Sequence, residues 1–245
     1  MKQKIVALIP ARYAASRFPG KLMQVLKGKT IIRRTFEAVQ KSALFDDVVV
    51  VCDDDSIEHE IQSIGGTTFR SSREFESGSD RIAEAAAKLE ADVIVNVQGD
   101  EPFIAQEALQ RLILLFSNPD VQIASLMMSI HDPEKFMNPN CVKVVVDRLN
   151  RALYFSRAPI PFLRDGGLPV SAFQHIGIYA FRKKALLEFT QMPPSPLEQS
   201  EKLENLRMLE NGWAVHMVQV ESVGISIDTP EDFLAAAAFL EQNGE

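Results

Sequence analysis

Short apolar segments alternate along this chain with stretches in which apolar residues recur every three or four positions. The apolar segments have the length of strands and are rich in valine and isoleucine, as is typical of strands buried on both faces of a parallel sheet. They cover residues 5–9, 47–52, 67–70, 92–98 and 122–130. The helix-like stretches lie between them, at residues 30–42, 56–64, 81–89 and 105–116. This alternation predicts an α/β fold with a doubly wound, mostly parallel, Rossmann-like sheet.

The second half of the chain is more mixed, and we expect it to form a lobe on the same sheet. Its predicted strands cover residues 142–147, 174–181 and 213–220. An amphipathic helix is predicted over 197–209 and a final helix over 230–240, where Thr229 is a suitable N-cap and Pro230 suits the first helical position. The sequence has no internal repeat, low-complexity tract or linker, which predicts a single domain over residues 1–245.

The composition is that of a globular protein and excludes some partners. With a formal charge of -7, the 245-residue chain is poorly suited to bind nucleic acid or an anionic membrane surface. No apolar run approaches transmembrane length, and the apolar part of the N-terminal segment is too short for a signal peptide. Cys52 and Cys141 are far apart and each lies beside valines, so we expect buried, reduced thiols and a cytoplasmic location.

A group of cations follows the first predicted strand. Arg12, Arg17 and Lys21 come after the strand at 5–9, and a Pro-Gly pair sets a turn between the last two. Guanidinium and ammonium groups on a short loop can share the charge of a polyphosphate. The loop matches neither the P-loop pattern nor the glycine-rich dinucleotide turn, so recognition would depend on side chains. A solvated basic connection is the alternative.

Two aspartates end predicted strands at what would be the same edge of the sheet. Asp100 follows the strand at 92–98 and is preceded by a glycine, and Asp228 follows an apolar segment before the last helix. Ligands of open α/β sheets bind beyond the carboxyl ends of the strands. Two carboxylates there, facing cations, suit a Mg²⁺ ion shared with phosphate oxygens. The alternative is that each aspartate only turns or caps the chain, which is the role we assign to the three aspartates at 53–55.

The segment 77–81, with the sequence Ser-Gly-Ser-Asp-Arg, is predicted to be a loop that starts the helix at 81–89. Its hydroxyls, its glycine and the N–H groups of the helix start suit a base, a ribose or a phosphate. Such sequences also serve as simple helix caps, so the segment alone does not define a ligand.

Eight motifs follow one another in an order that covers nearly the whole chain. They are PARYAASRFPGK, SGSDR, NVQGDEP, NPNCVKVV, ALYFSRAPIP, HIGIYAF, SPLEQSEKLENLRML and IDTPED. Together they resemble the 3-deoxy-manno-octulosonate cytidylyltransferase (CMP-Kdo synthetase) family. The first loop and the strand-end aspartate are shared with nucleotidyltransferases in general, whereas YFSRAPIP and HIGIY narrow the resemblance to this family.

The resemblance implies a nucleotidyltransferase fold with an elaborated lobe for sugar binding and dimerisation, and hence a homodimer. It implies the reaction CTP + Kdo → CMP-Kdo + pyrophosphate, which serves bacterial lipopolysaccharide biosynthesis. The anomeric hydroxyl of Kdo, an acidic eight-carbon sugar, would attack the α-phosphorus in line, and Mg²⁺ would neutralise charge on the phosphates.

The residues to which the resemblance assigns roles fall into three groups. The nucleotide-binding group is Arg12, Arg17, Lys21, Ser77, Arg81 and Gln98. The metal group is Asp100 and Asp228, which are expected to act in catalysis together with Arg12 and Lys21. The sugar group is Gln98, Arg157, His175, Tyr179, Glu201 and Glu204, with Arg157 at the sugar carboxylate.

Members of the sugar group also have structural interpretations. Arg157 lies in an apolar segment and needs an anion, which could be an internal carboxylate instead of a substrate. His175 and Tyr179 are four residues apart on a predicted strand and therefore share a face, where a histidine could be a core residue. Glu201 and Glu204 could belong to a solvated helical face.

Two positions depart from the family pattern. Phe75 stands where the family commonly has histidine, and Asn205 stands where it typically has glutamine. Either change could alter which sugar is accepted, for example in favour of 8-amino-Kdo. Two competing interpretations are a sialic acid substrate and a non-catalytic nucleotide-binding module. The sugar-lobe motifs count against the former, and the retained cations and carboxylates count against the latter.

Overall fold

The computed structural model describes residues 2–13, 18–73, 75, 78–166, 172–222 and 224–242. Contacts within the chain divide it into two compact units. Unit 1 comprises Met1–Leu109 and Val223–Glu245, and unit 2 comprises Gln110–Ser222. Unit 1 is therefore built from both ends of the sequence. The single domain expected over residues 1–245 remains a prediction, which this division into units does not test.

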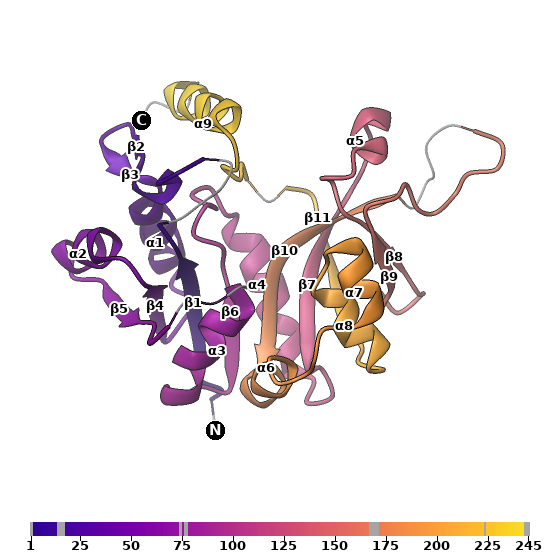
Figure 1. Ribbon diagram of the computed structural model, residues 1–245, viewed down its shortest axis with the longest axis horizontal. Helices are drawn as coiled ribbons and strands as arrows, with labels where there is room; N and C mark the ends of the chain where they lie inside the picture. The colour runs from indigo at the N-terminus through magenta and orange to yellow at the C-terminus, as the bar shows by residue number, and fades with distance from the viewer. Residues whose placement is uncertain are drawn as a thin grey trace. The chain divides into compact units, whose positions relative to one another are not determined.

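The sheet of unit 1 is parallel, and a helix follows each of its strands in the sequence (Figure 1). The strand order is β6 (Val93–Asn96), β1 (Ile5–Ala11), β4 (Asp47–Cys52) and β5 (Thr67–Arg70). The helices are α1 (Ile31–Lys41), α2 (Asp55–Ser63), α3 (Gly78–Lys88) and α4 (Gln106–Leu114). Val6, Leu8 and Ile9 of the inner strand β1 have no exposed surface. The apolar runs therefore form strands because both of their faces are covered.

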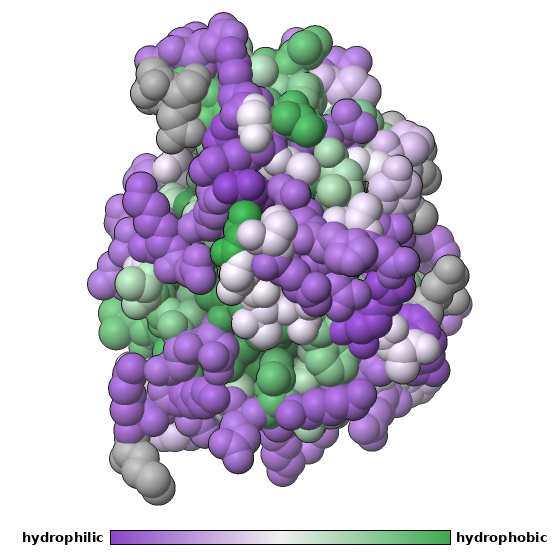
Figure 2. Space-filling view, turned by 90° about the vertical axis from the view of Figure 1, so that its left-hand side faces the viewer, coloured by the Kyte–Doolittle hydropathy of each residue, from purple (hydrophilic) through white to green (hydrophobic). Residues whose placement is uncertain are grey.

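Smaller elements complete unit 1. The loop after β1 leads into η1 (Lys21–Met23), and β2 (Val25–Leu26) pairs with β3 (Lys29–Thr30) in a hairpin. The last helix, α9 (Pro230–Gln242), returns to the same unit. Figure 2 shows that hydrophilic residues predominate on the side of this unit that carries α2, with smaller hydrophobic areas between them.

Helix α3 corrects one expectation about the segment 77–81. The helix begins at Gly78, three residues earlier than predicted, so that Asp80 and Arg81 belong to its first turns instead of a preceding loop. An acidic side chain in the first turn is favourable because the helix dipole is positive there. Gly78 and Arg81 consequently have fixed positions on a helix.

Unit 2 has a mixed sheet centred on β7 (Ile123–Ser129). Strand β11 (Val215–Val220) pairs with β7 in parallel, and β10 (Phe173–Arg182) pairs with it antiparallel. Two further antiparallel strands extend β10, β8 (Lys143–Val146) and β9 (Ala152–Ser156). The short helices of this unit are η2 (Leu115–Ser117), α5 (Pro133–Met137), α6 (Lys183–Phe189), α7 (Pro196–Glu201) and α8 (Asn205–Glu210).

One prediction in unit 2 is wrong, and one strand of this unit was not predicted. The helix expected over 197–209 is two helices, α7 and α8, because Lys202 between them adopts a left-handed conformation with φ of 54°. Glu201 and Glu204 are therefore not on one continuous helical face. The segment after β8, for which the sequence pattern predicted no strand, begins with strand β9, whose residues pair with β8.

The predicted α/β class with a mostly parallel central sheet is confirmed. Within the described residues, no helix is long and apolar enough to cross a membrane. The carboxyl ends of β1 and β6 carry the loops that the sequence marked for phosphate and metal binding, and both loops belong to unit 1.

Candidate active site

Lys21 brings together the two aspartates that the sequence placed at strand ends. Asp100 follows β6, but the prediction of a strand before Asp228 is wrong, because the described residues between β11 and α9 form no strand. Its Nζ donates hydrogen bonds to the carboxylate of Asp100 and to Oδ1 of Asp228, the latter at 2.9 Å. Lys21 and Asp100 are largely covered, with 13% and 18% of their side chains exposed. The carboxylates come from segments 128 residues apart (228 minus 100), yet their oxygens converge on one ammonium group.

Local backbone features hold these three side chains in place. Gly20, in a left-handed conformation with φ of 63°, directly precedes Lys21 and η1. Gly99 precedes Asp100, and a Cβ atom there would lie 3.1 Å from the carbonyl oxygen of Pro10. Ile227 donates its N–H to the carbonyl of Asp100 at 3.0 Å, which links the two carboxylate-bearing segments directly.

The charges of this cluster stabilise one another. Burial acts to lower the pKa of Lys21, but the charges and hydrogen bonds of Asp100 and Asp228 outweigh it and raise the pKa above its ordinary value. Lys21 is thus a cation at neutral pH.

Glu101 is a residue that the sequence reasoning missed. Its side chain is buried, and Oε2 has no hydrogen-bond partner among the described residues. Burial, followed by the negative charge of Asp100, raises the pKa of Glu101 to about 8. The available signal is a second carboxylate directly after Asp100 in the motif NVQGDEP.

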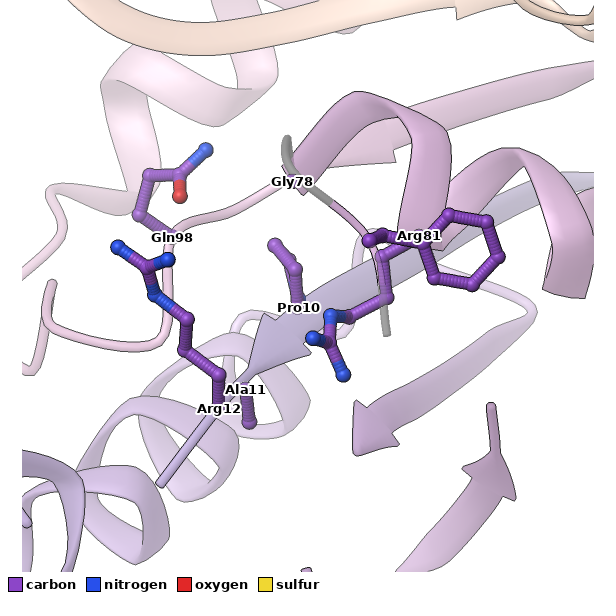
Figure 3. A pocket seen from close by; sticks show the side chains of 7 residues that line it. Pro10, Ala11, Arg12, Gly78, Arg81 and Gln98 are labelled. Carbon is purple, nitrogen blue, oxygen red and sulfur yellow. The ribbon is translucent and has the colours of Figure 1, made fainter. Parts of the chain in front are cut away.

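A polar pocket of about 140 Å³ lies at the end of β1 in the same unit. Its walls are formed by Pro10, Ala11, Arg12, Phe75, Gly78, Arg81 and Gln98. Figure 3 shows the guanidinium of Arg12 near the amide of Gln98 on one side of Pro10, and the guanidinium of Arg81 on the other side. Three members of the expected nucleotide-binding group therefore line one cavity. Two others, Arg17 and Ser77, lie outside the described residues.

Arg81 is held in this pocket by Asp53. The arginine is 4% exposed, and its Nη2 lies 2.7 Å from Oδ2 of Asp53. Its Nη1 is buried and has no hydrogen-bond partner in the described part of the chain. The prediction that Asp53 caps helix α2 is wrong, because Asp54 alone makes that cap by accepting from the N–H groups of Ser56 and Ile57. A buried N–H donor without a partner favours binding of an acceptor.

Arg157 and Glu201 form the first part of a second group of polar residues, in unit 2. The Glu201 carboxylate accepts from Ser156 Oγ at 2.6 Å and from the Arg157 N–H at 2.9 Å. The Arg157 guanidinium donates to the backbone carbonyls of Glu201 and Pro139, at 2.8 and 3.0 Å. Its described hydrogen-bond acceptors are all carbonyls. These contacts therefore do not support the alternative that an internal carboxylate pairs with the Arg157 guanidinium.

Lys143 is a second residue that the sequence reasoning missed. It has no exposed surface, and its Nζ donates to the carbonyls of Asn138, Cys141 and Arg157, at 2.9, 2.6 and 2.7 Å. Burial lowers its pKa. Lys143 fixes the backbone of Arg157, and no sequence pattern announces such a role because all three acceptors are backbone groups.

His175 and Tyr179 lie side by side, as predicted, with ring centroids 5.3 Å apart. Strand β10 is irregular between Ile176 and Tyr179, so simple alternation along a strand is not what brings them together. The Tyr179 hydroxyl has hydrogen bonds with Asn205 and Ser125, and burial raises its pKa. Burial lowers the pKa of His175 to about 3, so the imidazole is neutral at physiological pH.

The lowered pKa of His175 predicts a pH-dependent loss of stability. The unfolded chain binds a proton near pH 6.5 and the folded chain does not, so the free energy of unfolding falls as the pH decreases below 6.5. We expect the wild type to lose about 1.3 kcal/mol more than His175→Gln between pH 7.5 and 5.5. Urea denaturation at both pH values measures this difference, and equal losses in the two proteins would contradict the burial of a neutral histidine.

The two polar groups belong to an α/β fold, and comparison with known proteins specifies the class of protein. Residues 6–222 match the family described as Cytidylyltransferase, and the chain belongs to this family. Within it, the chain is 56% identical to the 3-deoxy-manno-octulosonate cytidylyltransferase of Flavobacterium johnsoniae, over 97% of this chain and 98% of that protein. It is 49% identical to the protein of the same name from Christiangramia forsetii, over 98% of each. These matches confirm the resemblance found in the motifs.

Solved structures agree. The structure of CMP:2-keto-3-deoxy-manno-octonic acid synthetase complexed with CTP superposes with a TM-score of 0.92 at 36% identity, covering 98% of this chain and 99% of that one. A 4-diphosphocytidyl-2C-methyl-D-erythritol synthase from Anaerococcus prevotii is 18% identical, with a TM-score of 0.65 over 98% of this chain and 99% of that one. The second likeness shows that the two proteins share a fold.

Proposed function

We propose that the protein transfers CMP from CTP to 3-deoxy-D-manno-octulosonate (Kdo), releasing pyrophosphate, for lipopolysaccharide biosynthesis. The anomeric hydroxyl oxygen of Kdo forms a bond to the α-phosphorus as the bond from that phosphorus to the β-phosphate oxygen breaks. The hydroxyl proton passes to water, and the pyrophosphate leaves with the electron pair of the broken bond. The observation that carries the proposal is the convergence of Asp100 and Asp228 on Lys21, in the same unit as the cationic pocket.

The carboxylates of Asp100 and Asp228 fit a bound Mg²⁺ ion. Their oxygens already meet at one positively charged group, Lys21 Nζ. No group of three or more potential metal ligands occurs among the residues described, but Mg²⁺ is commonly held by one or two carboxylates together with substrate phosphates. When bound, the ion would neutralise charge on the phosphate oxygens. The two aspartates would hold it by their carboxylates.

The cations have separate tasks in this mechanism. Lys21, which is charged at neutral pH, is suited to stabilise the charge that develops on the leaving pyrophosphate. Arg12 would bind the triphosphate from the pocket wall, together with Arg17. Arg81 and Gln98 line the same pocket and would contact the nucleotide, along with Ser77.

Asp53 is expected to support nucleotide binding through Arg81. In Asp53→Asn, the guanidinium would lose its charged partner, and we expect the KM for CTP to rise about fivefold, because a charge-assisted hydrogen bond contributes roughly 1 kcal/mol more than a neutral one. Asp54→Asn is the matched control, since Asp54 caps α2 and should affect stability only. Steady-state kinetics with varied CTP tests this, and an equal effect in both variants would contradict it.

The sugar would bind to the polar group of unit 2. The Arg157 guanidinium, whose described contacts are neutral carbonyls, is available to neutralise the Kdo carboxylate. His175, Tyr179, Glu201 and Glu204 would contact the sugar hydroxyls. Asn205 is 2% exposed, and its Oδ1 has no hydrogen-bond partner among the described residues. This departure from the family pattern therefore leaves an acceptor within the Tyr179 cluster.

Location and assembly complete the proposal. The two cysteines are free and buried, which supports a reducing cytoplasm, where CTP is also available. A homodimer is supported by apolar side chains exposed on and after β9, where Leu153 is 61% and Phe162 is 86% exposed.

Pyrophosphate release by the purified protein with Mg²⁺ and CTP tests the function. We expect release with Kdo and CTP, and little with ATP, GTP or UTP. Parallel assays with 8-amino-Kdo and a sialic acid test whether Phe75 and Asn205 change the accepted sugar. If 8-amino-Kdo were preferred, the mechanism would stand and the substrate would change. If no pyrophosphate were released with any sugar, a non-catalytic nucleotide-binding module would be favoured.

A further inference from the structure

Ser125 is a buried residue of β7 to which the mechanism above gives no role. Its side chain has no exposed surface. Opposite it, the pairing of β7 with β10 shifts, so that Leu126 faces Ile176 but Ser125 faces Tyr179. Strand β10 thus carries extra residues at this point. Such bulges redirect the neighbouring side chains, which here are those of His175 and Tyr179.

The hydroxyl of Ser125 is shared between this bulge and the imidazole. Its Oγ lies 3.1 Å from the carbonyl oxygen of Ile176, 2.9 Å from that of Ile178 and 3.0 Å from Nε2 of His175. A hydroxyl has one hydrogen and two lone pairs. If the hydrogen pointed at His175, both buried carbonyl oxygens would face lone pairs, which is unfavourable. The hydrogen therefore points towards the carbonyls, and Oγ accepts from an N–H at Nε2. The second lone pair can accept from the Tyr179 hydroxyl, which is also hydrogen-bonded to Ser125.

Two aromatic rings pack against the imidazole. The Phe155 ring meets it edge-on with centroids 4.9 Å apart, and Tyr179 lies 5.3 Å away. Within the described residues, Ser125 is the hydrogen-bond partner of the imidazole ring. Because burial keeps the ring neutral, a proton on Nε2 leaves Nδ1 with a lone pair that can only accept.

We propose that Ser125 is a positioning residue that fixes His175 in its Nε2–H tautomer and so presents Nδ1 as an acceptor for a sugar hydroxyl. The choice of sugar as the ligand rests on the proposed function, whereas the tautomer follows from the hydrogen bonds alone. The site would then favour a sugar with a hydroxyl that donates to Nδ1 over a sugar with a group that cannot donate at that position.

The tautomer can be measured in protein labelled with ¹⁵N-histidine, by long-range ¹H–¹⁵N correlation at pH 7.5. His175→Gln identifies the signals of His175 among those of the four histidines. We expect a protonated Nε2 and an unprotonated Nδ1 in the wild type. Ser125→Ala should mix the tautomers, and Ser125→Thr should restore the single one. A wild-type Nδ1–H tautomer would overturn the proposal, and this measurement decides it even if Ser125→Ala does not fold.

Kinetics test the consequence for the substrate. In Ser125→Ala the KM for Kdo should rise about five- to tenfold, which is the change expected from the loss of one hydrogen bond. The KM for CTP should stay unchanged. Ser125→Thr should return the KM for Kdo towards that of the wild type. An unchanged KM for Kdo beside an altered tautomer would overturn the acceptor role of Nδ1. If the wild type has no activity with Kdo, the proposed function fails, but the spectra still report the tautomer.

Discussion

Asp100→Asn is expected to fold normally and to lose a factor of roughly 10²–10³ in turnover, the usual cost of removing one group that stabilises charge in a transition state. The amide keeps the shape of the side chain but removes the negative charge that faces Lys21 and would hold Mg²⁺. Pyrophosphate release at saturating CTP and Kdo measures the loss, and a titration with Mg²⁺ should show that more metal is needed for half-maximal rate.

Asp55→Asn provides the control for this variant. Asp55 is also paired with a cation, Arg70, at 2.6 Å, but its side chain is 80% exposed on α2. Exposed pairs of this kind contribute little, so we expect wild-type turnover. Near-normal activity of Asp100→Asn would refute the assignment of the metal site. Equal losses in the two variants would point to a general effect of charge.

Gly224→Ala is expected to lower the free energy of unfolding by roughly 3 kcal/mol, from backbone strain together with overpacking. Gly224 has φ of +90°, and an added Cβ would lie 2.1 Å from the carbonyl oxygen of Phe103. The chain can escape this clash only by moving its backbone. Because Asp228 lies four residues further on, we expect turnover to fall as well.

Gly65→Ala separates the two causes of this loss. Gly65 also has a positive φ, +75°, but an added Cβ would meet nothing within 4 Å. We expect it to lose about 1 kcal/mol, the cost of the left-handed conformation alone. Urea denaturation of both variants makes the comparison. Equal losses would show that the contact with Phe103 does not constrain the segment that leads to Asp228.

The parts of the fold that depend on local pattern could be predicted. The strands of unit 1 are valine- and isoleucine-rich runs buried on both faces, and their alternation with helices determined the α/β class. Asp100 could be placed in advance because it follows β6, and parallel strands expose their carboxyl ends at one edge of a sheet. Asp228 follows no strand among the described residues, and its position beside Asp100 comes from its contact with Lys21. The sequence singles out Lys21 as one of three cations that follow a buried strand, and the motif resemblance gives it a role; the loop alone leaves a solvated connection open.

The parts that depend on distant contacts could not be predicted. Lys202 interrupts a sequence with a good helical pattern by adopting a left-handed conformation. Lysine is not a residue type that favours this conformation, so the sequence does not indicate the break. Lys143 and Ser125 bind backbone carbonyls of segments remote in sequence, which no spacing of side chains reveals. Asp53 resembles its neighbour Asp54 in sequence, and only the position of Arg81 separates their roles.

The discontinuous construction of unit 1 has a consequence for how the protein is made. Lys21 and Asp228 are 207 residues apart, and helix α9 belongs to the same unit as the first strand. A nascent chain emerges from the ribosome in order, so β1 and its loop must wait for the last segment before the carboxylate pair exists. A translation product that stops before Asp228 would lack half of that pair. Synthesis at least as far as Asp228 is therefore a condition for bringing both carboxylates to Lys21.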